Sequence, residues 1–204
     1  MHEFAAGAET LYNGASFGHL DRHDRWHALG CVIGFDMLIN NWDRLPFAWA
    51  NAGNAGNLLV SADGSITAID QAIGLIVDET NRTGYFQHVK ALLECGKLWL
   101  RHQEAGTAPT GQEFLPLHHA IGRVAELVAA LTGGKPMEVG QKTSMVSGMV
   151  EMLEFSSGLF AQEEFSEVVQ ALSSRLPEGM RDQEGDISAS VSQVVDLARA
   201  IARN

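Results

Sequence analysis

Apolar residues form one long run near the start of the chain and recur at helical spacing in its second half. The run WHALGCVIGFDMLI, residues 26–39, contains no proline and is longer than a typical strand, so it predicts a buried helix. Beyond residue 84 the intervals of three and four predict amphipathic helices. Their approximate ranges are 86–100, 117–131, 143–160, 162–175 and 187–203.

A loop and two short strands are predicted between these helical regions. The segment NNWDRLPFAWANAGNAGN, residues 40–57, is rich in Asn and Gly, which favour turns, and long loops within compact domains are often functional. After it, the Asp63-Gly64 pair lies between two apolar stretches and is a strong signal for a tight hairpin turn. Strands are therefore predicted at about 57–61 and 65–69, and the fold class is α+β, mostly α.

The first residues of the chain differ in pattern from the rest. Residues 1–25 carry many small residues and weak periodicity, so we expect a loose N-terminal arm or the remnant of a preceding lobe. Residues 26–204 are expected to form one domain, because 46% hydrophobic composition over 204 residues allows one sizeable core.

Charge and cysteine content narrow the classes of partner and compartment. The formal net charge of -11 and the lack of a basic patch argue against nucleic acid as a partner. Cys31 and Cys95 form no CxxC pair, which indicates neither a zinc site nor a disulfide framework and favours the reducing cytoplasm. No run approaches the roughly 20 apolar residues that span a bilayer, so no membrane contact is expected.

Three polar residues lie at the ends of the predicted elements. Asp43 is in the loop after the first helix, Asn57 starts the first strand, and Asp70 ends the second. Because the two strands pair, Asn57 and Asp70 are expected to lie close together at the open end of the hairpin. Asn and Asp are also common at turns for purely local reasons, so a structural role is the alternative for each residue, including a surface ion pair of Asp43 with Arg44.

The chemistry of these three residues suits phosphoryl transfer. Mg²⁺ prefers hard oxygen ligands and usually takes one or two protein groups together with nucleotide phosphates, which Asn57 and Asp70 would satisfy. A further carboxylate, Asp43, would accept or orient the proton of an attacking hydroxyl. In kinases, one loop Asp serves the nucleophile while an Asn and a second Asp hold the metal. We therefore predict Asp43 as the catalytic residue and Asn57 and Asp70 as metal and cofactor ligands.

The same residues lie in a segment that resembles a known family. FDMLINNWDRLPFAWANAGNAGNLLV, followed by ITAIDQAIGLI, is similar to the catalytic segment of the actin-fragmin kinases and, more distantly, to the type II phosphatidylinositol 4-kinases. The motifs cover about residues 35–76, roughly a fifth of the chain. In this resemblance Asp43 matches the catalytic Asp, Asn57 the metal-binding Asn, and Asp70 the Asp of the DFG motif. The long loop leaves Asn54 as a competing metal ligand.

The resemblance implies a fold and an activity. The expected fold is a protein-kinase-like C-terminal lobe with a catalytic loop, β-hairpin and helical bundle, lacking most of the N-terminal β-lobe. A complementary N-lobe is therefore one expected partner, and the expected cofactors are ATP and Mg²⁺. The expected activity is phosphorylation of a Ser or Thr hydroxyl on a protein substrate, with actin the acceptor that the resemblance suggests. The alternative is a non-catalytic, kinase-like interaction module or a fragment that does not bind ATP.

Two further hypotheses concern other enzyme classes. A lipid kinase would follow from the more distant resemblance, although no basic or amphipathic membrane-binding patch accompanies it. A metal-dependent hydrolase could use His19, His23 and His27, which recur at spacing four, but interleaved Asp and Arg residues favour a solvated helix face.

Overall fold

The computed structural model describes residues 8–12, 23–70, 73–162, 167 and 184–203. In that part of the chain, the α+β, mostly helical fold class is confirmed, and the long apolar run ends its helix at Ile39 as predicted. The helix predicted over 162–175 lies almost entirely outside the described residues. The helices are α2 (His23–Ile39), α3 (Glu79–Glu104), α4 (Leu115–Leu131), α5 (Val139–Phe160) and α7 (Glu184–Ala202), with short 3-10 turns η1 (Ala55–Asn57) and η2 (Gln112–Phe114).

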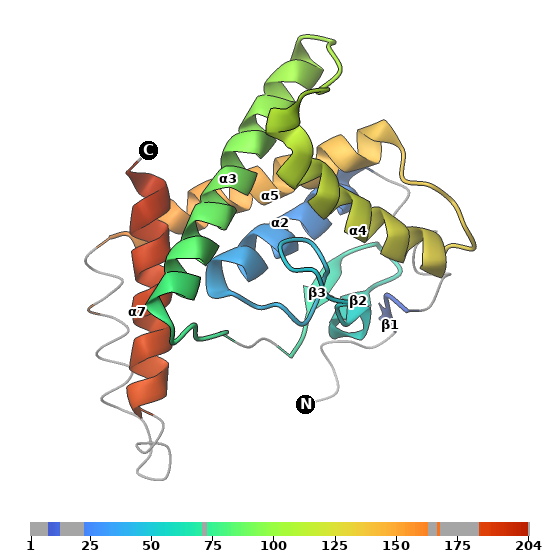
Figure 1. The fold of residues 1–204 in the computed structure, drawn as a ribbon. Coiled ribbons are helices and arrows are strands. Elements are labelled where there is room, and N and C mark those ends of the chain that lie inside the picture. The colour runs from blue at the N-terminus through green and yellow to red at the C-terminus, as the bar shows by residue number, and fades with distance from the viewer. Residues whose placement is uncertain (1–7, 13–22, 71–72, 163–166, 168–183, 204) are drawn as a thin grey trace.

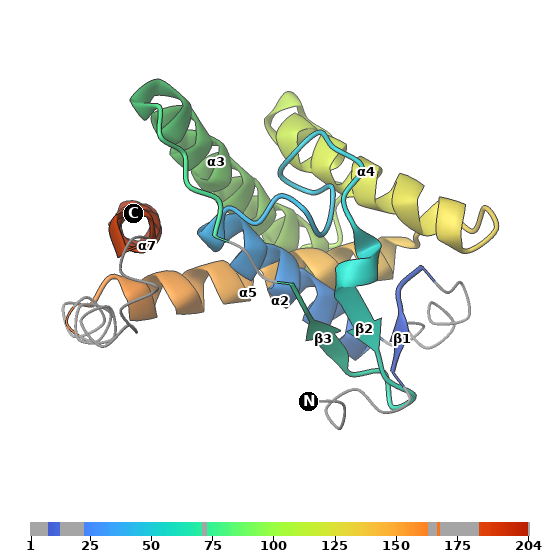
Figure 2. The same cartoon turned by 90° about the horizontal axis from the view of Figure 1, so that it is seen from below.

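The helices are organised around a crossing of α2 and α5. Helix α2 packs mainly on α5, and α5 also contacts α3 and α7 (Figures 1 and 2). The small sheet lies beside α2, so α2 has a helix on one side and strands on another (Figure 2). Fully buried side chains such as Ile33 and Met37 of α2 and Met149 of α5 form the centre of the core. The chain that leaves α2 therefore starts from a rigid base.

Glycines allow the backbones of α2 and α5 to approach closely. A Cβ atom added at Gly148 would lie 1.9 Å from the carbonyl oxygen of His27, and one added at Gly30 would lie 1.9 Å from that of Met145. Backbone atoms of packed helices cannot move aside as a flexible side chain can, so any larger residue must separate the helices.

We expect Gly148→Ala to lower the free energy of unfolding by about 2–3 kcal/mol because it overpacks this crossing. Gly158→Ala is the matched control, since Gly158 lies on the same helix and an added Cβ would meet no atom within 4 Å. That variant should be neutral or more stable by up to about 1 kcal/mol, owing to the higher helix propensity of Ala. Urea unfolding of both variants measures the difference, and equal stability of the two would contradict the close crossing.

The predicted hairpin is confirmed. Strands β2 (Leu58–Val60) and β3 (Ile66–Ala68) pair antiparallel with Leu58 opposite Ala68. Their turn contains Gly64 at φ +85°, and the Gly64 amide donates to the carbonyl of Ser61 at 2.7 Å. A turn with positive φ is the geometry that an Asp-Gly pair favours.

Part of the segment predicted to be a loose arm is ordered. Strand β1 (Glu9–Thr10) pairs antiparallel with β2, which makes an antiparallel sheet of order β1-β2-β3 within the described residues. Leu11 is only 1% exposed and belongs to the core, and α2 begins at His23 rather than near residue 26. The arm was predicted from weak periodicity, but a two-residue strand is too short to produce a periodic pattern. The division at residue 25 stays a prediction.

One segment differs from the expectation that no stretch resembles a membrane span. Gln112–Leu131 is long and apolar enough to cross a bilayer by length and composition. This is weak evidence for a span, because core helices of soluble proteins pass the same test. Helix α4 buries one face on the core through residues such as Leu117, Ile121 and Val124.

Candidate functional site

The loop that carries Asp43 begins with a sharp reversal at the end of α2. Asn40 adopts φ +53°, a left-handed conformation that Asn tolerates better than most residues. The Asn41 amide then donates to the Asp36 carbonyl at 2.8 Å, which is the hydrogen bond of a Schellman-type helix end. This reversal starts the loop that carries Asp43.

The structure brings Asp43 and Asn57 into direct contact. The Asn57 side-chain nitrogen Nδ2 donates to Oδ2 of Asp43 at 3.1 Å, across 14 residues of sequence. Asn57 is 8% exposed, so the contact lies at a buried edge of the loop. Asn54 supports it from the other side, because Nδ2 of Asn54 donates to Oδ1 of Asn57 at 3.3 Å. Oδ1 of Asn54 in turn accepts from the Gly56 amide at 3.2 Å, so both polar atoms of this side chain are engaged locally.

Asp70 lies at the same end of the hairpin. The Ile69 amide donates to the Asn57 carbonyl at 2.9 Å, which continues the β2–β3 pairing to the residue before Asp70. Asp70 is exposed and adopts φ +52°, an uncommon conformation for a residue other than glycine. Such backbone conformations persist only where the surrounding structure holds them, and they often occur at functional sites. The predicted convergence of Asn57 and Asp70 is therefore present at the level of the backbone.

A buried ion pair lies beneath the loop. The Arg44 side chain is fully buried and binds Asp36 of α2 through Nη1, while its Nη2 donates to the Ile69 carbonyl at 3.0 Å. Asn41 also donates to Oδ1 of Asp36, at 3.2 Å. The alternative that Arg44 forms a surface pair with Asp43 is therefore wrong. Arg44, the residue after Asp43, instead connects α2 with the residue before Asp70.

The carboxyl of Asp36 has a raised pKa. Burial raises its pKa to about 6, and the attraction of Arg44 together with hydrogen bonds from Arg44 and Asn41 limits the rise. Its second oxygen, Oδ2, is buried without a hydrogen-bond partner, so only one oxygen of the carboxylate is compensated. Removal of either Arg44 or Asp36 would therefore leave the other charge buried without its partner.

The comparison with protein families decides the family resemblance. Residues 1–89 match the family model for the catalytic domain of actin-fragmin kinase. This match confirms the predicted resemblance to the actin-fragmin kinases, while the more distant one to type II phosphatidylinositol 4-kinases stays a prediction. It supports a kinase-like phosphotransferase function for the matched region. It contains Asp43, Asn57 and Asp70, and it ends within α3. No curated protein matches the chain.

Side chains of α3 and α4 also hold the loop that carries Asp43, and one of them, Arg123, lies beyond the matched region. Arg123 of α4 donates through Nε to the Pro46 carbonyl at 3.0 Å and through Nη2 to that of Phe47. His88, at the end of the matched region, donates to the Ala48 carbonyl at 3.1 Å. Trp49 donates back to Asn40 at 3.1 Å. Loop carbonyls have no partners in a helix or sheet, so they need donors such as these from elsewhere in the fold.

The histidine cluster gives no metal site in the described part of the chain. His19 lies outside the described residues, and the side chain of His23 is not described. His27 pairs with Glu151 of α5 at 3.0 Å. No group of three His, Cys, Asp or Glu side chains suited to a metal occurs among the described residues. The predicted metal ligands are one carboxylate, Asp70, and one amide, Asn57, so they are a different donor set from a group of three such side chains.

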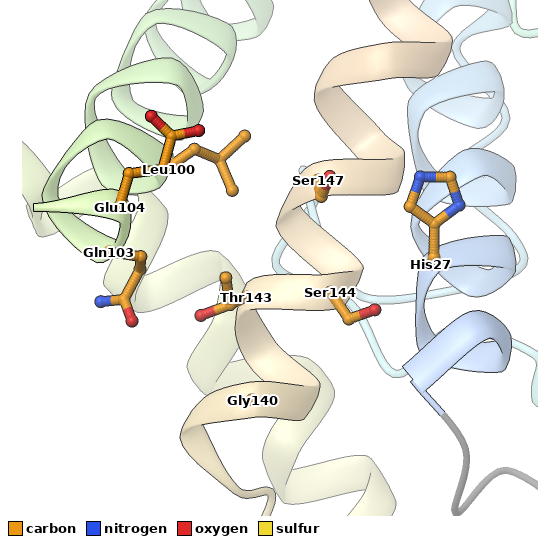
Figure 3. A pocket seen from close by; sticks show the side chains of 8 residues that line it. All are labelled: His27, Leu100, Gln103, Glu104, Gly140, Thr143, Ser144 and Ser147. Carbon is orange, nitrogen blue, oxygen red and sulfur yellow. The ribbon is translucent and has the colours of Figure 1, made fainter. Parts of the chain in front are cut away.

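A separate hollow lies away from the predicted site residues. Its volume is about 470 Å³, and it opens between α2, α3 and α5 (Figure 3). The hydroxyl-bearing residues of α5 line one wall and His27 another (Figure 3). Its polar lining residues are His27, Gln103, Glu104, Thr143, Ser144 and Ser147. None of Asp43, Asn57 and Asp70 lines this hollow.

Proposed function

We propose that this chain carries the metal-binding and catalytic half of an Mg-ATP-dependent phosphotransferase that modifies a Ser or Thr hydroxyl of a protein. The observation that carries the proposal is the hydrogen bond between Asn57 and Asp43 within a segment that matches the actin-fragmin kinase catalytic domain. Actin is the acceptor that this family suggests.

Asp43 is the residue to which we assign the acceptor hydroxyl. Asn57 holds Oδ2 of Asp43, so the carboxylate has a defined orientation, and Oδ1 is the atom that we assign to the substrate proton. Alignment of a nucleophile by a fixed carboxylate is the main task of such a residue, because phosphoryl transfer depends mostly on positioning and electrostatics. Trp42, next to Asp43, is 55% exposed and offers an apolar surface for a protein acceptor.

Asn57 and Asp70 are the residues to which we assign Mg²⁺. Both supply the hard oxygen donors that Mg²⁺ prefers, and two protein ligands leave room for phosphates and water. Oδ1 of Asn57 has two lone pairs, so it can accept from Asn54 and still coordinate. Asn54, the competing candidate, already caps η1 with its Oδ1, which supports Asn57 as the ligand. Asn57 and Asp70 would hold Mg²⁺, which would supply positive charge next to the nucleotide phosphates.

Transfer of radiolabelled phosphate from Mg-ATP to a set of protein acceptors that includes actin tests this proposal. We expect labelling that requires Mg²⁺ and is lost in Asn57→Ala. Asn81→Ala is the control, because Asn81 is exposed in the first turn of α3, away from the hairpin, and should retain labelling. If the wild-type chain shows neither transfer nor Mg²⁺-dependent nucleotide binding by calorimetry, the non-catalytic interaction module becomes the better interpretation.

A further inference from the structure

Gly74 and Ile76, a few residues after Asp70, are held by a side chain from the far end of the chain. Gln193 of α7 donates through Nε2 to the Gly74 carbonyl at 2.8 Å, and its Oε1 accepts from the Ile76 amide at 2.7 Å. One amide side chain thus pairs with a donor and an acceptor of the same short segment. Gln193 lies 119 residues from Gly74 and outside the region that matches the kinase family.

Gly74 is also held from its other side. Its amide donates to the Ile39 carbonyl at 3.1 Å, and its carbonyl accepts from Nδ2 of Asn40 at 2.8 Å as well as from Gln193. An added Cβ at Gly74 would lie 2.3 Å from the carbonyl oxygen of Asn40, so the close approach requires glycine. This point of the chain is therefore fixed between the end of α2 and α7.

Asp70 lies between two such fixed points. On one side Arg44 holds the Ile69 carbonyl at 3.0 Å, and on the other Gln193 and Asn40 hold Gly74. Asp70 itself has the left-handed φ of +52°, a conformation that requires support from its surroundings. Anchors at Ile69 and Gly74 are a means by which the exposed carboxylate of Asp70 can be kept in a fixed place.

We propose that Gln193 is a positioning residue for Asp70, so that α7 is required for metal binding at the hairpin as well as for packing. The inference rests on the proposed function only for the role of Asp70 as a metal ligand. It deepens that function by adding a residue from the C-terminal helix to the site. Loss of a group that supports a metal ligand typically lowers metal affinity by about 10–100-fold. Gln193 supports Asp70 through the backbone at Gly74.

The packing of α7 does not by itself explain Gln193. The helix contacts the core through apolar residues such as Val194, Leu197 and Ala198, which are 4%, 1% and 0% exposed. Gln193 is 2% exposed, and a buried amide is costly unless it is hydrogen-bonded. An apolar residue would serve packing alone, whereas an amide with both polar atoms bound to one backbone segment serves to hold that segment.

Gln193→Met tests the proposal because it keeps the length of the side chain and removes both hydrogen bonds. We expect hydrogen exchange at the Ile76 amide to become roughly tenfold faster or more, since the partner that protects it is lost. The Mg²⁺ concentration for half-maximal transfer should rise by roughly tenfold, with a smaller effect on turnover at saturating Mg²⁺.

Gln87→Met is the control, because Gln87 is exposed on α3 and should leave exchange and Mg²⁺ dependence unchanged. Unchanged exchange at Ile76 in Gln193→Met would overturn the proposal, and so would faster exchange with an unaltered Mg²⁺ requirement. Mn²⁺ binding measured by electron paramagnetic resonance separates the two hypotheses. A wild-type chain that neither transfers phosphate nor binds Mn²⁺ with nucleotide overturns the proposed function and the metal role of Gln193, while exchange at Ile76 still decides whether Gln193 holds the segment.

Discussion

Replacement of Arg44 by Met is expected to lower the free energy of unfolding by about 3–5 kcal/mol. Arg44 is 0% exposed and is the cationic partner of Asp36, which is 2% exposed, so the variant leaves a carboxylate buried without its counter-charge. It also removes the donor to the Ile69 carbonyl. Urea unfolding at neutral pH measures the loss. Arg101→Met is the control, because Arg101 is exposed on α3 and its replacement should change stability by no more than about 0.5 kcal/mol.

The stability deficit of Arg44→Met should depend on pH. The folded-state pKa of Asp36 is about 6, above the ordinary 3.8, and loss of Arg44 would raise it further. A carboxyl with a raised pKa contributes stability that is full below its unfolded-state pKa and is lost as the pH rises through its folded-state pKa. The deficit is therefore expected to be larger at about pH 8 than at about pH 5. Adding Asp36→Asn to Arg44→Met should restore much of the stability, and a double variant no more stable than Arg44→Met would contradict the pairing.

Elements with strong local signals could be predicted from the sequence. The apolar run up to Ile39 and the Asp63-Gly64 turn each carry their information within a few residues, and both appear in the structure. Helix starts were less accurate, because the first turns of a helix are often polar. Helix α3 begins at Glu79 after an N-cap at Asp78, before the apolar spacing becomes visible near residue 86.

The supports of the candidate site could not be predicted in the same way. Arg44 follows Asp43 directly, and a charged dipeptide in a loop is usually exposed, so nothing local indicates that Arg44 is buried on Asp36. Gln193 meets Gly74 only because α7 returns to the end of α2, a contact between distant segments. One signal was present for Asp36, a carboxylate inside an otherwise apolar helical run, since such a residue requires a buried partner.

The same contrast applies to the three predicted site residues. Asn57 and Asp70 were expected to converge because a hairpin joins them, and the hydrogen bond from Ile69 to Asn57 places their backbones together. The contact between Asn57 and Asp43 depends on the path of the whole intervening loop, which hydrogen bonds from Arg123 and His88 hold in place. The chemical roles of these residues could be predicted from residue types and their order. The orientation of Asp43 could not, because it depends on the three-dimensional path of the loop.

Asp43→Asn is expected to reduce the rate of phosphoryl transfer by about 10²–10⁴-fold, the range typical for loss of a positioned acid or base. The amide has nearly the shape of the carboxylate but cannot take up the substrate proton. It could still accept from Nδ2 of Asn57, so the loop and the bound nucleotide should be little changed. We therefore expect the loss in turnover, with nearly unaltered nucleotide affinity, in single-turnover kinetics and calorimetry.

Asp196→Asn provides the matched chemical control for this variant. Asp196 is exposed on α7, so the same loss of one negative charge occurs on another element, outside the loop. If the effect of Asp43→Asn arose only from the change in net charge, both variants would lose activity to a similar extent. If Asp43 instead aligns the acceptor hydroxyl, Asp196→Asn keeps full turnover, and Asp43→Asn loses it with unfolding free energy close to that of the wild type. Turnover of Asp43→Asn equal to that of the wild type would remove Asp43 from the mechanism, because a carboxylate that aligns the nucleophile cannot be dispensable.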